Sequence, residues 1–327
     1  MTLPQRLLQQ SESEAHKVRV PRAALLAATL AVASLGVGAC SGDSNPSTEQ
    51  SDGASSTQQE HFDRESLEPP SDIHQMLPND ITNDGTLRVA MALDYVPAEY
   101  LLDNGLPAGY NVEIALAMGS IMGVQVEIDD VPFPDLSQEI GSSANIGISS
   151  LTITPERLED FEMVSYMEVG SVFAVANGNP GKFNPQSPCG STVGVLEESS
   201  QLKRLQVLNN QCTGEGESAI EVESLAQLSD IVARVIEGKI DAVFADSGVL
   251  AYTVEDTNGK MELIGEVVDV QAQGVAVPKD NEQLTVATQA ALQHLMDEGY
   301  LEEILAPYSA GAMALTQAQI SPNPANS

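Results

Sequence analysis

Positively charged residues are scarce in this sequence. Its 327 residues include 14 lysines and arginines against 47 aspartates and glutamates, which gives a formal net charge of −33. Binding to DNA or RNA depends on basic side chains that displace counterions from the phosphate backbone, and an acidic surface repels that backbone. The composition therefore argues against a nucleic-acid partner, and the excess of acids serves at least to keep the protein in solution.

Histidine and cysteine are scarce as well, with four and three residues. Protein zinc sites group such ligands at short, regular spacings. Here the histidines lie far along the chain from Cys189 and Cys212, at four scattered positions: His16, His61, His74 and His294. The sequence thus predicts no metal site, and no motif in it predicts a cofactor.

The N-terminus carries an apolar run from Ala23 to Ala39, preceded by several basic residues. The run is shorter than the roughly 20 residues of a membrane span and is typical of a signal peptide, which we predict for residues 1–39. Val37-Gly38-Ala39-Cys40 resembles the lipobox of bacterial lipoproteins, in which the cysteine carries lipid and becomes the new N-terminus. The resemblance implies lipidation at Cys40, which would anchor the protein at the extracytoplasmic face of the cell membrane. An ordinary cleavage site or an uncleaved anchor is the alternative.

The two remaining cysteines are Cys189 and Cys212. In a protein outside the cell, such a lone pair predicts a disulfide. Closing the loop between them should stabilise the fold by about 3 kcal/mol.

The rest of the chain divides into a polar segment and a folded body. Residues 40–80 are rich in Ser, Gln, Glu, Asp, Asn and Pro without sustained periodicity, so we predict a disordered tether. Beyond it, short apolar runs such as 87–93 and 192–196 alternate with helical patterns, one of them with Asn111 as its N-cap. Alternation at this spacing predicts an α/β fold of parallel or mixed sheets covered by helices. The length allows two lobes.

Hydroxyl groups gather around an arginine in the stretch ISSLTITPER, residues 148–157. The tetrapeptide TPER is by itself typical of a helix start, with Thr154 as the N-cap. In an extended chain, however, Ser150, Thr152 and Thr154 project to one side. Arg157 then enters from the first helical turn, where free N–H groups favour an anion, and a guanidinium matches a carboxylate with two parallel hydrogen bonds. The stretch predicts a receptor for a small carboxylate.

Several segments in the same order along the chain resemble a known family. The opening GTLRV, the loop YVPAE and the helix start GYNVE come first, followed by SSLTITPER, then VGVLEESS and DAVFAD: residues 85–89, 95–99, 109–113, 149–157, 193–200 and 241–246. Together they resemble the family-3 extracellular solute-binding proteins of ABC transporters for polar amino acids. The resemblance implies a two-lobe, type II periplasmic-binding-protein fold in which the chain crosses twice between lobes, near Gly170 and Gln273. Lobe 1 would then comprise residues 81–170 and 274–327, and lobe 2 residues 171–273.

The resemblance also implies roles for individual residues. Arg157 would bind the α-carboxylate of the ligand and Asp246, from the other lobe, its α-ammonium. The remaining contacts would be hydroxyl groups that help to hold the carboxylate and aromatic walls for the side chain: Ser150, Thr152, Ser200, Tyr95 and Phe133. The physical chemistry agrees, because a zwitterion needs one fixed cation, one fixed anion and apolar walls. Dividing these groups between two lobes makes closure depend on the ligand.

Three positions depart from the family pattern. Ala98 replaces a phenylalanine, which should enlarge or reshape the pocket. Ala92 stands where binders of cationic side chains carry an acid, which argues against lysine, arginine or histidine as the ligand. Glu198 replaces a glycine, so the loop backbone is expected to differ there, and its carboxylate is a candidate contact for a ligand amine.

We therefore expect a monomeric, lipid-anchored binding protein that delivers an amino acid or a similar small zwitterion to the membrane subunits of an ABC permease. Two alternatives stay open. One is a periplasmic enzyme on the same fold, similar to cyclohexadienyl dehydratase, with Glu198 as an acid; no Ser–His pair or phosphate-binding loop supports catalysis. The other is a sensory lipoprotein that uses the fold without transport.

Overall fold

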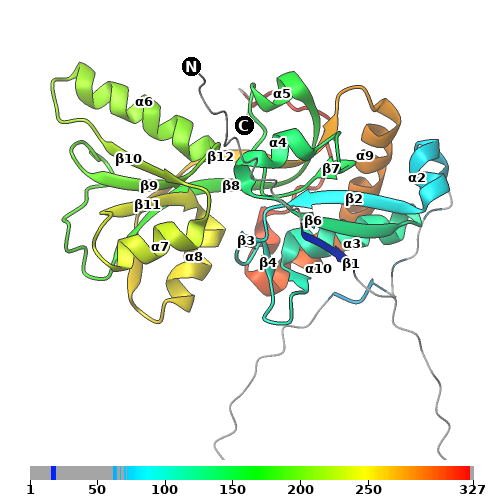
Figure 1. Ribbon diagram of the computed structural model, residues 1–327, viewed down its shortest axis with the longest axis horizontal. Coiled ribbons are helices and arrows are strands. Elements are labelled where there is room, and N and C mark those ends of the chain that lie inside the picture. Colours follow the sequence, from blue (N-terminus) through cyan, green and yellow to red (C-terminus); the bar gives the residue numbers. More distant parts are fainter. Residues whose placement is uncertain (1–15, 20–61, 65–66, 68–69, 71, 325–327) are drawn as a thin grey trace, which may run out of the picture. The chain divides into compact units, whose positions relative to one another are not determined.

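The computed structural model describes residues 16–19, 62–64, 67, 70 and 72–324 (Figure 1). Most of the predicted signal peptide, Cys40 and most of the predicted tether lie outside the described residues. The four described residues of the predicted signal segment form strand β1 (His16–Arg19), which pairs antiparallel with β6 (Gln125–Asp130). In the described part of the chain, no helix combines the length and the apolar character needed to cross a membrane.

A nine-stranded mixed sheet organises these residues, in the order β1-β6-β2-β7-β12-β8-β11-β9-β10. On the lobe 1 side, β2 (Thr86–Met91) pairs parallel with β6 and with β7 (Ile146–Gly147). On the lobe 2 side, β9 (Thr192–Leu196) pairs parallel with β10 (Glu221–Leu225) and β11 (Ala242–Asp246). These parallel groups confirm the α/β class predicted from the alternating pattern.

Two long antiparallel strands run through both groups (Figure 1). They are β8 (Phe161–Ala176) and β12 (Met261–Pro278), paired from Phe161↔Pro278 to Ala176↔Met261 with three irregularities in register. Gly170 and Gln273, the predicted crossovers, each fall inside one of these strands. At Gly170 the strands approach so closely that a Cβ atom would lie 2.2 Å from Cγ1 of Val267. The exact bounds of the lobes stay a prediction, and we keep the names lobe 1 and lobe 2 for the ranges given above.

Helices cover the sheet on both sides of the long strands. Lobe 1 carries the two helices with the most buried positions, α3 (Tyr110–Met122) and α9 (Glu282–Asp297), together with several short ones: α1 (Ile73–Met76), α2 (Asn79–Asp84), α4 (Leu136–Glu139), α5 (Arg157–Asp160) and α10 (Tyr300–Leu305). Lobe 2 carries α6 (Ser200–Gly214), α7 (Leu228–Ile236) and α8 (Ser247–Asp256). A separate small sheet joins β3 (Asp94–Tyr95), β4 (Glu99–Leu101) and β5 (Pro107–Ala108).

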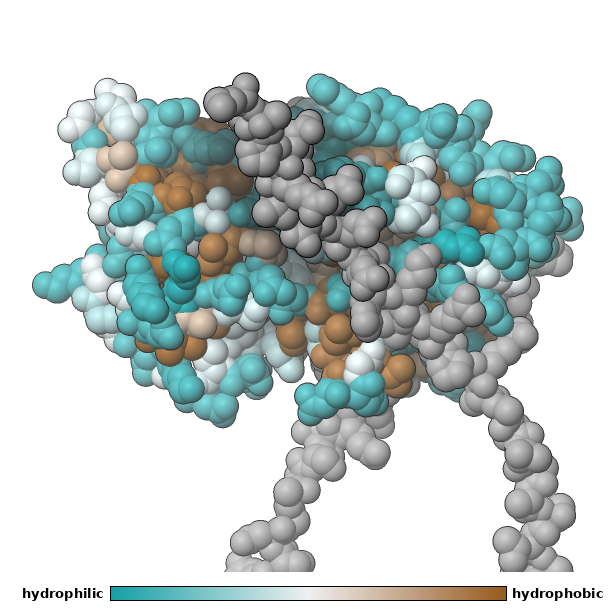
Figure 2. Space-filling model, viewed as in Figure 1, coloured by the Kyte–Doolittle hydropathy of each residue, from teal (hydrophilic) through white to brown (hydrophobic). Residues whose placement is uncertain are grey.

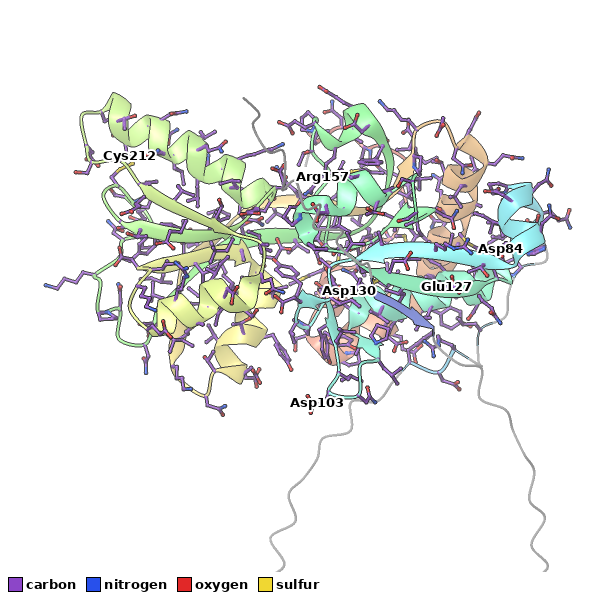
Figure 3. The ribbon with its side chains drawn as sticks, viewed as in Figure 1. Asp84, Asp103, Glu127, Asp130, Arg157 and Cys212 are labelled. Carbon is purple, nitrogen blue, oxygen red and sulfur yellow. A yellow bond between two sulfur atoms is a disulfide. The ribbon has the colours of Figure 1, made fainter. Side chains whose placement is uncertain are left out.

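The predicted disulfide is present between Cys189 and Cys212, which are 23 residues apart in sequence with their Cα atoms 5.6 Å apart. Figure 3 shows Cys212 near the end of α6 that points away from Arg157. The bond therefore fastens the outer end of this helix to lobe 2, inside a core cluster that includes Phe173, Phe183 and Phe244.

The structure corrects the prediction at two points. The predicted tether reaches residue 80, but α1 begins at Ile73, and Leu67, Ile73 and Leu77 are buried in the core. Asn111 is not the N-cap of α3, because that helix begins at Tyr110 after Gly109, and the Asn111 side chain is fully buried. In both cases tertiary contacts, which local composition does not report, decide the outcome.

Hydrophilic residues cover most of the face of the molecule shown in Figure 2, with hydrophobic ones between them.

Candidate functional site

One pocket brings together all seven side chains that the sequence placed in a ligand site. It is lined by Tyr95, Phe133, Ser150, Thr152, Arg157, Ser200 and Asp246, and in addition by Leu196, Ser199 and Gln201. The residues come from both lobes: the first five from lobe 1 and the others from lobe 2. Their shared location is a finding, whereas their contact with a ligand stays a prediction.

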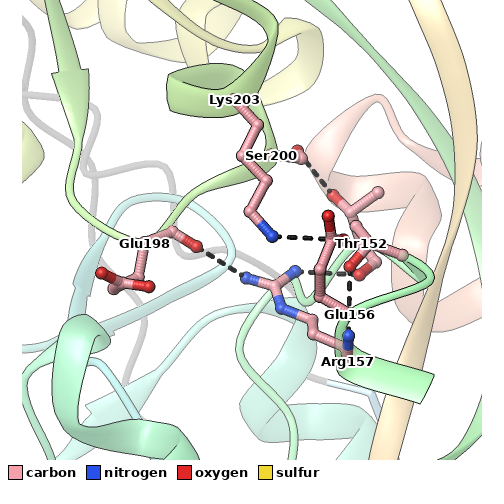
Figure 4. A network of polar contacts seen from close by, with 7 residues as sticks. Thr152, Glu156, Arg157, Glu198, Ser200 and Lys203 are labelled. Atoms are coloured by element: carbon pink, nitrogen blue, oxygen red, sulfur yellow. Dashed lines mark hydrogen bonds and ion pairs between the residues drawn. The ribbon is translucent and has the colours of Figure 1, made fainter. Parts of the chain in front are cut away.

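Arg157 lies at the start of α5 and points toward lobe 2 (Figure 4). Its Nη1 donates to the carbonyl oxygen of Thr152 at 2.8 Å and its Nη2 to that of Glu198 at 3.2 Å. The guanidinium carbon lies 5.7 Å from the ring centre of Phe133, within the range of a cation–π contact. Burial lowers the pKa of Arg157 to about 10, although the charge of Asp246 acts in the opposite direction. The group therefore stays cationic at neutral pH and is directed at the pocket.

The three hydroxyls of the opening stretch do not line one face, as an extended chain would require. Ser150 has a positive φ of 51°, so the strand geometry is broken at that residue. Its Oγ accepts from Asn111 at 3.1 Å, whereas Thr152 Oγ1 lies 3.1 Å from Ser200 Oγ in the other lobe. Thr154 Oγ1 accepts from the backbone N–H of Arg157 at 3.3 Å, but α5 begins only at Arg157 and its N-cap is Glu156, so the prediction of Thr154 as the N-cap is wrong. Thr152 and Ser150 still face the pocket, each with a different partner.

Asp246 ends β11 and is almost completely buried. Gln201 donates to its Oδ1 and Gln273 to its Oδ2, both at 2.8 Å. Its backbone N–H donates to the hydroxyl of Tyr95 at 3.3 Å, which is a contact between the lobes. Burial raises the pKa of Asp246 to about 6, while the two amides and the charge of Arg157 favour the ionised form. The pocket thus holds a cation and an anion that act on each other electrostatically from opposite lobes.

A second carboxyl group, for which the sequence predicted no role, lies beside the pocket. Glu99, on β4, is fully buried. Asn111 donates to its Oε2 at 2.6 Å and Ser149 to its Oε1 at 2.8 Å, while Tyr166 donates to Asn111 at 2.9 Å. Desolvation raises the pKa of Glu99 to about 8, and the charge of Asp246 adds to that effect. This network also holds Ser150 through Asn111, so it supports one wall of the pocket.

Sequence reasoning also missed two glutamines at the site, Gln201 and Gln273. Gln201 directly follows the serine pair at the start of α6, so its place beside Ser200 was an available signal. Gln273 stands on β12 at the predicted crossover and carries no local signal for a contact with Asp246, 27 residues away. Only the pairing of β12 with β8 and β8 with β11 brings these groups together.

The three departures from the family pattern have different consequences. Neither Ala92 nor Ala98 lines the pocket, and Ala98 is completely buried in the core, so the effect of Ala98 on the size or shape of the pocket stays a prediction. Glu198 has a φ of 54°, the left-handed region that favours glycine. The loop therefore keeps a conformation suited to the family's glycine, and the exposed side chain of Glu198 does not line the pocket.

Further polar contacts join the lobes outside the lining of this pocket. Lys203 on α6 forms an ion pair with Glu156 at 3.1 Å (Figure 4), and Ser229 on α7 donates to Asp94 at 3.0 Å. The side chains of the ion pair are both largely exposed, so it contributes at most about 1 kcal/mol. Among the residues that the structure describes, no group of three or more His, Cys, Asp or Glu side chains could hold a metal ion.

Two α/β groups joined by a pair of long strands, with a charged pocket between them, define a two-lobed solute-binding protein of the type II periplasmic class. Residues 87–311 match the model of the bacterial extracellular solute-binding proteins, family 3. The chain belongs to this family.

Individual proteins that are similar to this chain agree with the family assignment. The chain is 27% identical over 261 residues to the arginine-binding protein ArgT of Corynebacterium glutamicum, covering 79% of this chain and 86% of that protein. An ancestral arginine-binding protein, solved with arginine bound, is 25% identical over 68% of this chain and 98% of its own, with a TM-score of 0.63. An ancestral amino-acid-binding protein described as a precursor of cyclohexadienyl dehydratase has a TM-score of 0.64 at 21% identity, covering 70% of this chain and 98% of its own. That last likeness concerns the fold alone.

Proposed function

We propose that this protein captures a free α-amino acid between its lobes and delivers it to the membrane subunits of an ABC importer. The observation that carries the proposal is the placement of Arg157 and Asp246, from opposite lobes, in one pocket. Arg157 binds the α-carboxylate, with Thr152, Ser150 and Ser200 completing its contacts. Asp246 binds the α-ammonium, and Tyr95 and Phe133 flank the side chain.

Closure follows from this division of charges. A ligand stabilises the closed form only by binding it better than the open form. A zwitterion that bridges Arg157 and Asp246 binds the closed form better, because only in that form can its carboxylate contact one lobe and its ammonium the other. The existing contacts between the lobes, such as Thr152 with Ser200, then align the two halves.

The side chain of the amino acid is polar and uncharged in this proposal. Asp246 is the one acidic residue that lines the pocket in the described part of the chain, and it is assigned to the ammonium. No second acid is left there for a lysine or arginine side chain. L-arginine is the alternative, favoured by the ligand named for the relative from Corynebacterium glutamicum.

Thermal-shift screening of the purified protein against the twenty common L-amino acids tests the proposal. A ligand at 100 times its dissociation constant stabilises the native state by about 2.7 kcal/mol. We expect a clear shift with one or a few neutral polar amino acids. A shift with L-arginine alone would overturn the proposed side-chain class, and no shift with any amino acid would overturn the proposed function.

Binding without turnover is part of the proposal. The matching family is one of solute-binding proteins, and the described residues that line the pocket include no histidine or cysteine that could form a nucleophile–base pair. NMR spectra of the stabilising amino acid after prolonged incubation with the protein should remain unchanged. A new set of product signals would favour the dehydratase-like alternative. A deletion strain that loses a signalling response but still imports the amino acid would favour the sensory one.

Lipid attachment at Cys40 and a monomeric state complete the proposal. Both are predictions from the sequence, and Cys40 lies outside the described residues. Mass spectrometry of the mature protein should find acyl groups on an N-terminal Cys40, and Cys40→Ala should release the protein from the membrane fraction. A mature protein that begins elsewhere and stays on the membrane would contradict the anchor.

A further inference from the structure

Gln273 carries a buried hydrogen-bond acceptor that has no partner. The residue is 1% exposed, and its Oε1 is one of the few buried side-chain atoms without a hydrogen bond among the residues that the structure describes. A buried amide oxygen left unpaired costs about 1–3 kcal/mol. Native proteins rarely keep such a group unless a water or a ligand completes it.

The orientation of the amide follows from its other contact. Nε2 of Gln273 lies 2.8 Å from Oδ2 of Asp246. Exchanging the two amide atoms would bring an oxygen without a proton against a carboxylate oxygen, so the amide must direct its N–H group at Asp246. Oε1 is attached to the same carbon and is therefore held near this carboxylate. Because Oε1 only accepts hydrogen bonds, it cannot pair with the carboxylate itself.

The other glutamine at Asp246 provides a contrast. Gln201 donates to Oδ1 of Asp246 and to Ser171, while its own Oε1 accepts from Ser200 at 3.2 Å. Both glutamines therefore position the same carboxylate. Only Gln273 also keeps an open acceptor beside it.

We propose that Gln273 is a ligand-binding residue, whose Oε1 accepts a hydrogen bond from the α-ammonium group that Asp246 holds. An ammonium group has three N–H donors. The two oxygens of Asp246 already accept from amides, so this carboxylate alone leaves some of the three donors without a partner. The free acceptor belongs to the same amide as the N–H group that donates to Asp246, so in this proposal it receives a hydrogen bond from the ammonium that Asp246 holds, although Gln273 is not itself in the lining of the pocket. Because Gln273 stands on β12 where the chain crosses between the lobes, the contact also ties the ammonium to the hinge. The inference rests on the proposed function, since it requires an amino-acid ligand.

The test uses Gln273→Met, with Gln201→Met as its matched variant. Each substitution removes one amide donor from Asp246, but only the first removes the free acceptor. The probes are the amino acid that stabilises the wild type most in the thermal-shift panel and the carboxylic acid that lacks only its α-amino group. We expect Gln273→Met to raise the Kd for the amino acid about 10- to 100-fold, as for loss of a hydrogen bond to a charged group. The increase for Gln201→Met should be several-fold smaller, and the Kd of the deaminated acid should change less than about 2-fold in Gln273→Met.

Equal losses in the two variants, or an equal loss for both probes, would show that Gln273 only positions Asp246 and would overturn the inference. A crystal structure of the wild-type complex decides the matter without any variant. A distance of about 3 Å between Oε1 and the ligand nitrogen supports the contact, and a water on Oε1 with the nitrogen out of reach rejects it. If no amino acid stabilises the wild type in the thermal-shift screen, the proposed function itself is wrong. That outcome is seen before any variant is made and is thus distinct from failure of the inference on Gln273.

Discussion

Nη2 of Arg157 in lobe 1 lies 3.2 Å from the carbonyl oxygen of Glu198 in lobe 2. The side chain with the strongest predicted role in ligand binding thus also makes a direct contact across the pocket. Glu198 offers that carbonyl from a left-handed backbone conformation, one residue before the hydroxyl pair at the start of α6. A carboxylate arriving between the lobes would meet the guanidinium and the hydroxyl of Ser200 together.

Arg157→Ala should abolish ligand binding while the protein stays folded. Among the residues that the structure describes, the guanidinium is the one cation in the lining of the pocket, and its removal leaves the carboxylate of the ligand without a countercharge. We expect at least an about 100-fold rise in Kd, as for loss of a buried charged partner, measured by isothermal titration calorimetry. Arg157→Lys should recover only part of the affinity, because an ammonium cannot make two parallel hydrogen bonds.

Arg234→Ala is the control for that experiment. Arg234 forms a partly exposed ion pair with Glu223 at 2.6 Å in lobe 2 and does not line the pocket. Its removal should leave the Kd unchanged. Similar losses of affinity in both variants would mean that net charge, and not a specific contact, governs binding.

Ligand affinity should fall as the solution becomes more acidic than about pH 6. In the free protein the pKa of Asp246 is raised to about 6 by burial, so a growing fraction of the carboxyl is neutral below that pH. A neutral carboxyl attracts an ammonium weakly, and the Kd should rise by up to about tenfold per pH unit. Calorimetric titrations between pH 4.5 and 8 give this profile, and Asp246→Asn should bind weakly with a nearly flat one. A flat profile for the wild type would contradict the role of Asp246.

Glu99 should make the unliganded protein less stable at alkaline pH. The pKa of its buried carboxyl is raised to about 8 from an ordinary value of 4.5, so the folded state holds a proton that the unfolded state releases at lower pH. The free energy of unfolding therefore decreases as pH rises from about 4.5 to about 8 and changes little above that. Other acids with raised pKa values, Asp246 among them, act in the same direction at lower pH.

Glu99→Gln isolates this contribution. The variant cannot ionise, so its stability should decline less than that of the wild type over this pH interval, by an amount on the order of a few kcal/mol. Urea unfolding at pH 5, 7 and 9 measures both proteins. Parallel pH profiles for the two would show that Glu99 is not the group responsible.

Removal of the disulfide should weaken lobe 2 without preventing ligand binding. Closing a loop of 23 residues stabilises a fold by about 3 kcal/mol, mainly through the unfolded chain. The double variant Cys189→Ala, Cys212→Ala should lose about that much stability in urea unfolding. Because Cys212 lies near the end of α6 that points away from Arg157 (Figure 3), the thermal shift caused by the amino acid should persist. A lost shift in a variant that is still folded would place the disulfide in the control of the pocket.

Local patterns determined much of this protein. The alternation of apolar strands with helical segments predicts the α/β class, because burial imposes a period of two or 3.6 residues on neighbouring positions. The helix start TPER with its neighbouring hydroxyls pointed to Arg157 from local residues, whereas Asp246 was assigned only because DAVFAD resembles a segment of the family. The pairing of Cys189 with Cys212 followed from their being the only two candidates left.

The tertiary structure alone decided which groups meet at the site. Gln273 reaches Asp246, Asn111 turns inward to Glu99, and Ser150 leaves the extended conformation, although nothing local in the sequence requires any of these. Each contact joins residues that strand pairing and helix packing bring together from distant parts of the chain. The pKa values of Glu99 and Asp246 depend on the same packing, because burial and the arrival of partners set them.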